Sequence, residues 1–237
     1  MKKLVTAACA LVAASAFAVE SANTVGYVDN DGGVSGYNWA CGPFGNVGGN
    51  GFGIQNIVLD DGGEGLIFAN ALQVLDEDAY TDEMYFYNEV GDGVYEWQDE
   101  NDLTADRVFG SAEGFLIEGL EDITLRFVGE VPSQVISFTG TTTGYTWMGN
   151  PYPAAIDIQD VSLDDDGEGL IFSNALQVLD PDAYTDEMYF YNEVGDGVFE
   201  WQDENDTRAV RSFAAGEGFL IEGIEDIECS IAKPYNL

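Results

Sequence analysis

Apolar and polar residues alternate along several short stretches of this chain, which is the pattern of half-buried β-strands. One alternating run covers residues 83–90 and another covers residues 94–98. Asp92-Gly93 lies between the runs, and an Asp-Gly pair in this position is a strong signal for a two-residue hairpin turn. The pattern therefore predicts a β-hairpin.

The turn also predicts which hairpin residues share a face. If Asp92 and Gly93 alone form the turn, Asn88 lies opposite Trp97. The core face then carries Met84, Phe86, Val90, Tyr95 and Trp97, and the outer face carries Tyr85, Tyr87, Glu89, Glu96 and Gln98. A three-residue loop would shift this register.

Further strands are predicted after the hairpin. Residues 114–118 are apolar, and residues 123–127 alternate with their apolar side chains on one side. The only helix candidate is 66–75, which fits irregular structure equally well. Short strands, hairpin turns and the lack of a sustained helical period predict an all-β fold, either β-sandwiches or small barrels.

The chain contains two copies of one segment. Residues 59–102 match residues 163–206 with only four differences, and looser matches continue on both sides. A period near 100 residues is the size of an independent domain and is too long for a solenoid unit. We therefore predict two tandem β modules, residues 19–131 (repeat one) and residues 132–237 (repeat two).

Residues 1–18 have the features of a secretory signal peptide. Two lysines precede a short apolar run, and Ala16-Phe17-Ala18 fits an A-x-A cleavage signal. We therefore expect a bacterial protein that is exported through this signal and is secreted, extracellular or on the cell surface. No later apolar run has the length of about 20 residues that a membrane-spanning helix needs, so no transmembrane segment is expected.

Acidic residues dominate the composition. The chain has 44 Asp and Glu against 7 Lys and Arg, a net charge of −37. A surface of this sign repels nucleic acid and anionic membranes, so neither is an expected partner. The charge fits a solvated surface that resists aggregation or a surface that binds cations; we favour the first, because carboxylates at this density need no site to explain them.

Several classes of catalysis lack their residues. The chain has no histidine, and Lys233 is its only lysine after the signal peptide. Ser-His and Cys-His nucleophiles and histidine metal sites are therefore excluded. A glycoside hydrolase that uses paired carboxylates ranks last, because no local pattern selects one pair among so many acids. We expect no enzyme.

An acidic, glycine-containing turn is a candidate calcium site in both repeats, because clustered carboxylates on a tight turn suit calcium. The candidate ligands are Asp164, Asp165, Asp166 and Glu168 in repeat two, and Asp60, Asp61 and Glu64 in repeat one. The spacing does not fit an EF-hand, because Ala175 stands where a bidentate glutamate is required. A looser calcium site and a plain solvated turn both fit, and calcium is the only cofactor considered.

The predicted outer face of the hairpin is a candidate glycan site, because rings beside carboxylates and amides suit a sugar. The candidates are Tyr85, Tyr87, Glu96 and Gln98, with Tyr189, Tyr191, Glu200 and Gln202 in repeat two. The alternative is that these tyrosines pack against a second sheet or a neighbouring module, since strands favour tyrosine in any case.

Two cysteines, Cys41 and Cys229, follow the signal peptide. Both are patterned to face inward, and an exported protein can form disulfides. A bond within the chain would close nearly the whole mature sequence and constrain the unfolded state. A bond between chains and two buried thiols are the alternatives.

Residues 144–153, GYTWMGNPYP, resemble the GWNLIGNPYPS motif of β-rich modules in secreted and cell-surface proteins, notably of Bacteroidetes and related bacteria. Those modules also carry a later aromatic hairpin and a GxGF strand, which here resemble Trp201 and residues 216–219. Repeat one departs from the motif, because CGPFG at residues 41–45 replaces GNPYP. The resemblance implies surface or extracellular placement and a non-catalytic role.

These observations predict a secreted or cell-surface structural or adhesive protein built from a duplicated acidic module, since duplication raises avidity or reach without new chemistry. The alternative is a pair of carbohydrate-binding modules that calcium stabilises. The partners expected are an extracellular glycan, a surface protein or further copies of the chain.

Overall fold

The computed structural model describes residues 25–32, 36–45, 51–63, 71–76, 78, 80–118, 123–139, 145–164, 175–180, 182, 184–222 and 228–236. The predicted signal peptide lies outside these residues. Within them the chain is all-β, as predicted, and the only helical elements described are two 3-10 turns, η1 (Ile54–Asn56) and η2 (Ile158–Asp160).

The described strands of repeat one are β1 (Val25–Gly32), β2 (Tyr37–Cys41), β3 (Phe52–Gly53), β4 (Ile57–Asp60), β5 (Ala71–Leu75), β6 (Thr81–Gly91), β7 (Val94–Gln98), β8 (Val108–Phe109), β9 (Gly114–Glu118) and β10 (Ile123–Glu130). Those of repeat two are β11 (Ile136–Thr139), β12 (Tyr145–Gly149), β13 (Ile156–Asp157), β14 (Val161–Asp164), β15 (Ala175–Leu179), β16 (Thr185–Gly195), β17 (Val198–Gln202), β18 (Ser212–Phe213), β19 (Gly218–Glu222) and β20 (Glu228–Ile231).

The two repeats build the same set of antiparallel sheets. Repeat one has a five-stranded sheet in the order β2-β9-β5-β6-β7, a three-stranded sheet β1-β10-β4 and the pair β3-β8. Repeat two has β12-β19-β15-β16-β17, β11-β20-β14 and β13-β18. Each of these described sheets draws its strands from one repeat only.

The core of each repeat lies between its five-stranded and three-stranded sheets, in a sandwich-like arrangement. In repeat one, Leu125 and Phe127 of β10 pack in one cluster with Leu72 and Trp97 of the other sheet. The alternation along β10 is as predicted, because every second residue faces this cluster. An antiparallel sheet with one face on the core and one toward solvent produces this pattern.

The helix candidate is corrected where the structure describes it, because residues 71–75 form strand β5. Four of its five residues are buried, including Gln73, so the strand is covered on both faces. A strand buried on both faces loses its period-two signal, and for this reason the pattern did not reveal it. Residues 66–70 lie outside the described part of the chain.

The hairpin β6–β7 forms with Asp92 and Gly93 in its turn, at φ values of 50° and 77°. Its predicted register is wrong, because a β-bulge between Glu89 and Gly91 places Tyr87 opposite Trp97. A one-residue shift moves side chains to the other face of a sheet. Val90 is therefore 47% exposed, whereas Tyr87 is only 7% exposed.

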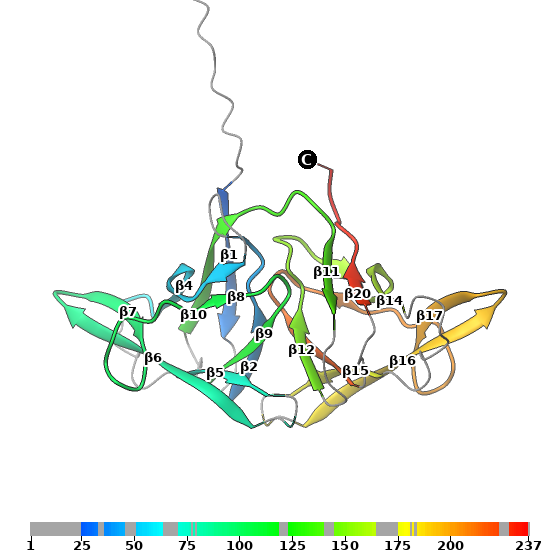
Figure 1. Ribbon diagram of the computed structural model, residues 1–237, viewed down its shortest axis with the longest axis horizontal. Helices are drawn as coiled ribbons and strands as arrows, with labels where there is room; N and C mark the ends of the chain where they lie inside the picture. The colour runs from blue at the N-terminus through cyan, green and yellow to red at the C-terminus, as the bar shows by residue number, and fades with distance from the viewer. Residues whose placement is uncertain are drawn as a thin grey trace, which may run out of the picture.

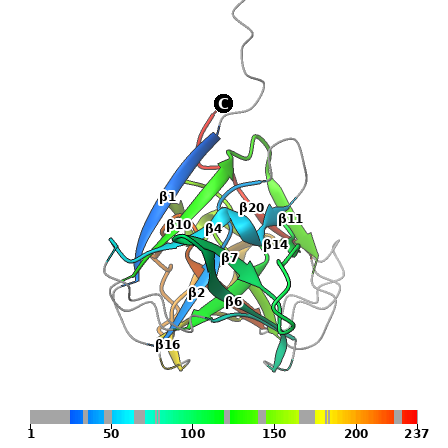
Figure 2. The same ribbon diagram turned by 90° about the vertical axis from the view of Figure 1, so that its left-hand side faces the viewer.

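The repeats lie side by side, and their hairpins point away from each other. Figure 1 shows β6–β7 and β16–β17 at the two ends of the longest axis, with β2 and β12 near the middle. In Figure 2, the strands β1, β10 and β4 lie above β6 on the side that faces the viewer. We call residues 80–102 and 184–206 the two wings, and the contact between the repeats the junction.

Candidate functional site

The junction is formed by main-chain pairing between equivalent parts of the two repeats. Ala40 forms a β-bridge with Glu217, and Glu113 forms one with Met148. Because Ala40 is equivalent to Met148, and Glu113 to Glu217, the two bridges are related by an approximate two-fold axis. The equivalent rings of Trp39 and Trp147 stack across this axis, with centroids 4.7 Å apart and an interplanar angle of 8°.

Three glycines permit the close approach at the junction. A Cβ at Gly114 would lie 2.8 Å from the main-chain N and O of Met148. A Cβ at Gly218 would lie 2.7 Å from the main-chain N of Ala40. Contacts this short leave no room for a side chain, so Gly114, Gly149 and Gly218 are required by packing between the repeats.

A buried corner after β12 supports the junction from within repeat two. Asn150 is fully buried, and its amide nitrogen lies 2.8 Å from the carbonyl of Ala154 and 2.9 Å from that of Ala214. Its side-chain oxygen accepts the N–H of Tyr152 at 3.0 Å. Its main-chain N–H donates to the carbonyl of Glu217 at 2.9 Å. Asn150 thus positions the residue that bridges to repeat one.

Tyr152 completes the same corner. Its hydroxyl accepts the N–H of Ile136 at 3.0 Å and donates to the carbonyl of Ile231 at 2.9 Å. Burial raises the pKa of this phenol, which stays protonated. The Asn-Pro-Tyr segment therefore has a structural role in this chain. Repeat one places the buried Phe44 in the corresponding segment, where it packs in the core.

In each repeat, a cluster of one arginine and two glutamates connects the wing to the junction. Arg107 pairs with Glu83 of β6 at 3.0 Å and with Glu113, the residue that bridges to Met148. Arg211 makes the same contacts with Glu187 and Glu217. Sequence reasoning did not assign this cluster a role. The available signal was that both repeats retain the arginine in a chain with so few basic residues.

A glutamine clamp in each repeat was also missed. The Gln55 amide donates to the carbonyls of Trp97 at 2.8 Å and Ala105 at 2.9 Å, and its oxygen accepts the Trp97 N–H at 3.1 Å. Gln159 holds Trp201 and Ala209 in the same way. The clamp pairs with the main-chain N–H and carbonyl of Trp97 on the free edge of β7. These polar groups next to the core therefore have hydrogen-bond partners.

The structure does not contain the predicted disulfide. Cys41 and Cys229 are both free and buried, in different places. Cys41 lies at the junction against Gly149, whereas Cys229 lies in the core of repeat two, opposite Leu163. Burial raises the pKa of both thiols, that of Cys229 to about 12. The inward pattern of each cysteine is confirmed, but an inward pattern does not specify which core a side chain enters.

The candidate glycan face is divided between the two sides of the sheet. Tyr87 lies in the core cluster, and burial raises the pKa of its phenol. Tyr85 packs against the same cluster, and its hydroxyl donates to Glu83. Glu96 and Gln98 interact with each other at 3.1 Å through the Gln98 amide. The corresponding arrangement in repeat two involves Tyr189, Tyr191, Glu200 and Gln202. The predicted face was wrong because the β-bulge shifts the hairpin register by one residue. The tyrosines pack inward against the core, which is the alternative given for them above.

The acidic turns are partly described. Asp60 accepts the N–H of Gly62 at 2.9 Å, and Asp61 accepts that of Gly63 at 2.8 Å, so both carboxylates stabilise their own turn. Asp164 ends strand β14. The remaining candidate calcium ligands, Glu64, Asp165, Asp166 and Glu168, lie outside the described residues. Within the described ranges, no group of three or more His, Cys, Asp or Glu side chains could hold a metal ion. Calcium binding stays a prediction.

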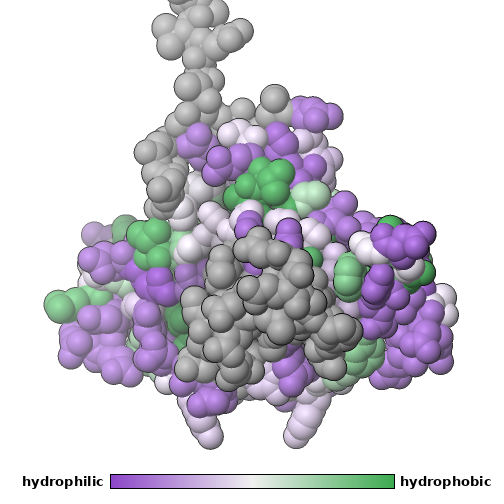
Figure 3. All heavy atoms as spheres, turned by 45° about the vertical axis from the view of Figure 1, so that its right-hand side comes forward, coloured by the Kyte–Doolittle hydropathy of each residue, from purple (hydrophilic) through white to green (hydrophobic). Residues whose placement is uncertain are grey.

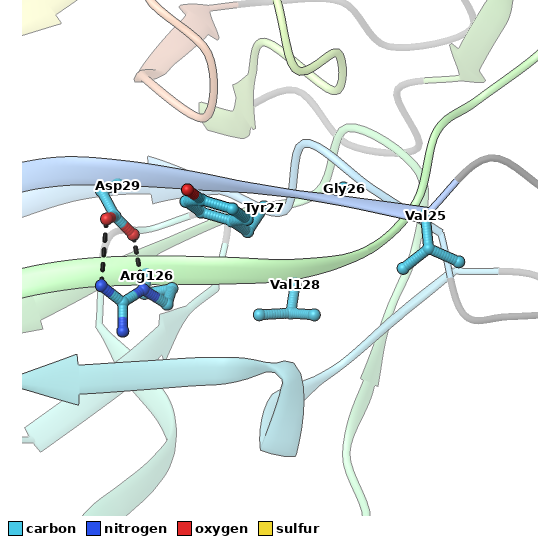
Figure 4. A pocket seen from close by; sticks show the side chains of 6 residues that line it. All are labelled: Val25, Gly26, Tyr27, Asp29, Arg126 and Val128. Carbon is cyan, nitrogen blue, oxygen red and sulfur yellow. Dashed lines mark hydrogen bonds and ion pairs between the residues drawn. The ribbon is translucent and has the colours of Figure 1, made fainter.

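A shallow pocket of about 510 Å³ lies on β1 and β10 of repeat one. Its lining is shown in Figure 4 and consists of Val25, Gly26, Tyr27, Asp29, Arg126 and Val128. Asp29 accepts two hydrogen bonds from Arg126, at 2.7 and 3.0 Å, and these bonds lower the pKa of Asp29. Asp60 accepts a further one at 3.2 Å. The guanidinium is thus held by two carboxylates, and Ser230 replaces Arg126 in repeat two.

Each wing exposes the same apolar residues. Tyr80 and Tyr184 are both 71% exposed, and Val94 and Val198 are both 57% exposed. Val90 and Val194 lie beside the turns and are also exposed. At the base of the first wing, Asp99 accepts the main-chain N–H groups of Leu103 and Asn101, and these bonds lower its pKa.

Comparisons with family models, with curated proteins and with solved structures found no match. Across the described ranges, none of the helices is long and apolar enough to cross a membrane. Among the coloured residues in Figure 3, hydrophilic residues predominate and apolar residues form small separate groups.

Proposed function

We propose that this protein is a non-catalytic structural or adhesive protein that acts outside the cell or on its surface. The observation that carries the proposal is that two near-identical hairpins, β6–β7 and β16–β17, extend from opposite ends of the folded molecule (Figure 1). A fold of this form can connect two surfaces or add reach without any chemical step.

The roles of the buried and perturbed polar groups support the same function. Asn150 and Tyr152 hold a corner, Gln55 holds a strand edge, and Asp99 holds a turn. Each of these groups makes hydrogen bonds to the main chain. Catalytic groups, in contrast, are commonly found in clefts with their reactive atoms directed toward a substrate.

The proposal is tested by locating the protein and measuring attachment. Cells that express the full-length gene are separated into cytoplasm, membrane, surface and medium, and they are compared with a deletion strain for attachment to surfaces. We expect the protein in the surface or medium fraction and weaker attachment of the deletion strain. A cytoplasmic protein, or hydrolysis of a glycoside that a single carboxylate substitution abolishes, would overturn the proposal.

Calcium as a stabiliser is tested separately. The melting temperature of the full chain is measured in millimolar calcium and in chelator, with magnesium as the control for ionic strength. A ligand that binds only the folded state raises the melting temperature in proportion to its occupancy. Equal values in calcium and magnesium would show that the acidic turns are solvated turns.

A further inference from the structure

We propose that the pocket on β1 and β10 of repeat one binds an N-acetylhexosamine residue of a neutral glycan. This pocket lies on the solvent-facing side of the three-stranded sheet, away from the hairpin on which the sequence predicted a glycan site. The proposal goes beyond the adhesive function proposed above. Sugar binding is tested on the purified protein, so its outcome does not depend on where the protein is located.

The first argument is that three exposed apolar side chains lie together at this pocket, those of Val25, Tyr27 and Val128. Val28 packs against the core, so the alternation of the strand turns Tyr27 toward solvent, where it is 70% exposed. Single exposed apolar residues are common, but a contiguous group that lines a hollow often marks a ligand site. The volume of about 510 Å³ is in the range of ligand pockets.

The second argument is that the two ends of the pocket differ in chemistry. Figure 4 shows the ring of Tyr27 along β1, with its hydroxyl group toward Asp29 and Arg126. The guanidinium carbon of Arg126 lies 6.0 Å from the centroid of this ring. Val25 and Val128 lie toward the opposite end in the same view. The pocket therefore offers an aromatic ring between a polar end and an apolar end.

The ion pair at the polar end keeps hydrogen-bonding capacity for a ligand. The guanidinium of Arg126 has further N–H donors beyond the three that bond to Asp29 and Asp60. Each carboxylate oxygen of Asp29 accepts one of these bonds and has a second lone pair. A hydroxyl group both donates and accepts, so neighbouring hydroxyls can bond to the carboxylate and the guanidinium without breaking the ion pair.

An N-acetylhexosamine matches both ends of the pocket. The C–H groups of a sugar ring form an apolar face that stacks on Tyr27, and its hydroxyl groups reach Asp29 and Arg126. The acetamido methyl group then contacts Val25 and Val128, which a simple hexose leaves uncovered. An anionic sugar does not fit, because the chain has a net charge of −37 and two carboxylates flank the single guanidinium.

The third argument is that repeat two forms the same sheet without these groups. The strand registers make Asp29 equivalent to Ser137 and Arg126 equivalent to Ser230. The same alignment replaces Val25, Tyr27 and Val128 by Ser133, Val135 and Ala232. The sheet therefore forms without the ion pair and the ring, and exposed ion pairs contribute little to stability. A ligand accounts for this polar and aromatic group on the surface of repeat one, whereas folding does not.

The test uses the purified chain without the predicted signal peptide and saturation-transfer NMR, which detects weak sugar binding. The probes are the methyl glycosides of N-acetylglucosamine and N-acetylgalactosamine. We expect at least one of them to bind, with the strongest saturation on its acetyl methyl protons. The matched controls are methyl glucoside and methyl galactoside, which lack the acetamido group, and methyl glucosaminide, which is a cation. Each control is expected to bind at least about tenfold more weakly.

Two variants assign the binding to this pocket. Tyr27→Val inserts the residue of repeat two and is expected to lower the affinity at least about tenfold. Tyr27→Val/Asp29→Ser/Arg126→Ser/Val128→Ala copies the surface of repeat two, keeps the net charge and is expected to abolish binding. Tyr80→Val changes a tyrosine of similar exposure outside the pocket and should bind as the parent does. Melting temperatures identify any variant that fails to fold, and Tyr27→Val alone then decides.

Four results would overturn the inference. Neither acetylated glycoside binds, the hexosides bind as well as the acetylated sugars, the cationic sugar binds best, or Tyr27→Val binds as well as Tyr80→Val. The third result would show a general attraction to the acidic surface. Sedimentation of the intact chain adds a fifth: self-association that the four-residue variant loses would identify a second copy of the chain as the occupant.

Cell attachment separates this inference from the proposed function. If cells with the Tyr27→Val variant attach as the parent does, the adhesive function stands and the pocket has no part in it. If the purified protein binds the sugar but the deletion strain attaches normally, the sugar site stands and the adhesive function is overturned.

Discussion

The two repeats differ at the junction, where they touch each other, and are alike in the wings, where they point apart. Cys41 and Gly149 are equivalent, and a Cβ at Gly149 would lie 2.4 Å from that of Cys41. Near a two-fold axis a residue meets its own counterpart, so two identical side chains there would collide. A homodimer cannot avoid this by changing one side, but a duplicated chain can.

The two sides of the junction also differ in residue type at one strained backbone position and in their hydrogen bonds. Ala112 adopts a φ of 66°, which its counterpart Gly216 adopts at 74° without a Cβ penalty. Trp147 donates its indole N–H to the carbonyl of Asp76 at 3.0 Å. The indole N–H of Trp39 is buried and has no partner among the described residues. The junction therefore has approximate symmetry in its main chain and asymmetry in its side chains.

The largest expected effect is at the glycines of the junction. Gly218→Ala should destabilise the chain by about 3 kcal/mol, because the added Cβ meets the main chain of Trp39 and Ala40. Urea unfolding measures this change. Gly45→Ala is the control, since its Cβ would meet no atom closer than 3.7 Å. Equal effects of the two substitutions would contradict the close approach of the repeats.

The next largest loss of stability is expected at Asn150, in the buried corner after β12 that supports the junction from repeat two only. Asn150→Ala should lower the free energy of unfolding by about 2 kcal/mol, because it leaves buried main-chain groups without partners. Asn101→Ala, an exposed asparagine of the wing, is expected to change stability by less than about 0.5 kcal/mol. Similar losses for both would contradict the contribution assigned to the buried hydrogen bonds of Asn150.

A smaller effect should reveal the asymmetry of the stacked tryptophans. Trp147→Phe removes a hydrogen bond and leaves the Asp76 carbonyl unpaired, whereas Trp39→Phe removes an unpaired donor. We expect the first substitution to cost about 1 kcal/mol more than the second. Thermal unfolding of the two variants measures the difference, and a larger loss for Trp39→Phe would reverse the assignment.

The smallest effect concerns the wings and depends on pH. The pKa values of Asp99 and Asp203 are lowered in the folded state by main-chain hydrogen bonds. A carboxyl with a lowered folded-state pKa stabilises the fold above its unfolded pKa of about 4, and this contribution is lost as the pH falls further. Asp99→Asn/Asp203→Asn should therefore flatten the fall of melting temperature between about pH 5 and 2.5. Glu100→Gln/Glu204→Gln removes the same charge from exposed neighbours and is the control for net charge. An equal change of slope in both double variants would contradict the role of the main-chain hydrogen bonds to Asp99 and Asp203.

The comparison also shows which features of the fold the sequence could predict. Strand β10 alternates because one face of its sheet is covered, and the prediction for it is confirmed. Strand β5 is covered on both faces, so its residues carry no period. The hairpin turn was predicted from Asp92-Gly93. The bulge at Val90 was not predicted, because no local pattern marks it: it places Tyr87 opposite Trp97, and the two rings then pack against each other in the core.

The sequence by itself determined the duplication, the β class, the net charge and the inward pattern of the cysteines, since these follow from residue identity and from local periodicity. Only the tertiary structure decided which surface each inward-facing residue packs against. It placed Cys41 at the junction and Cys229 in a core, turned Tyr87 inward, and brought Gly114, Gly149 and Gly218 against the opposite repeat. The physical reason is that periodicity records the presence of a covered face, whereas the identity of the covering surface depends on contacts between residues far apart in the chain.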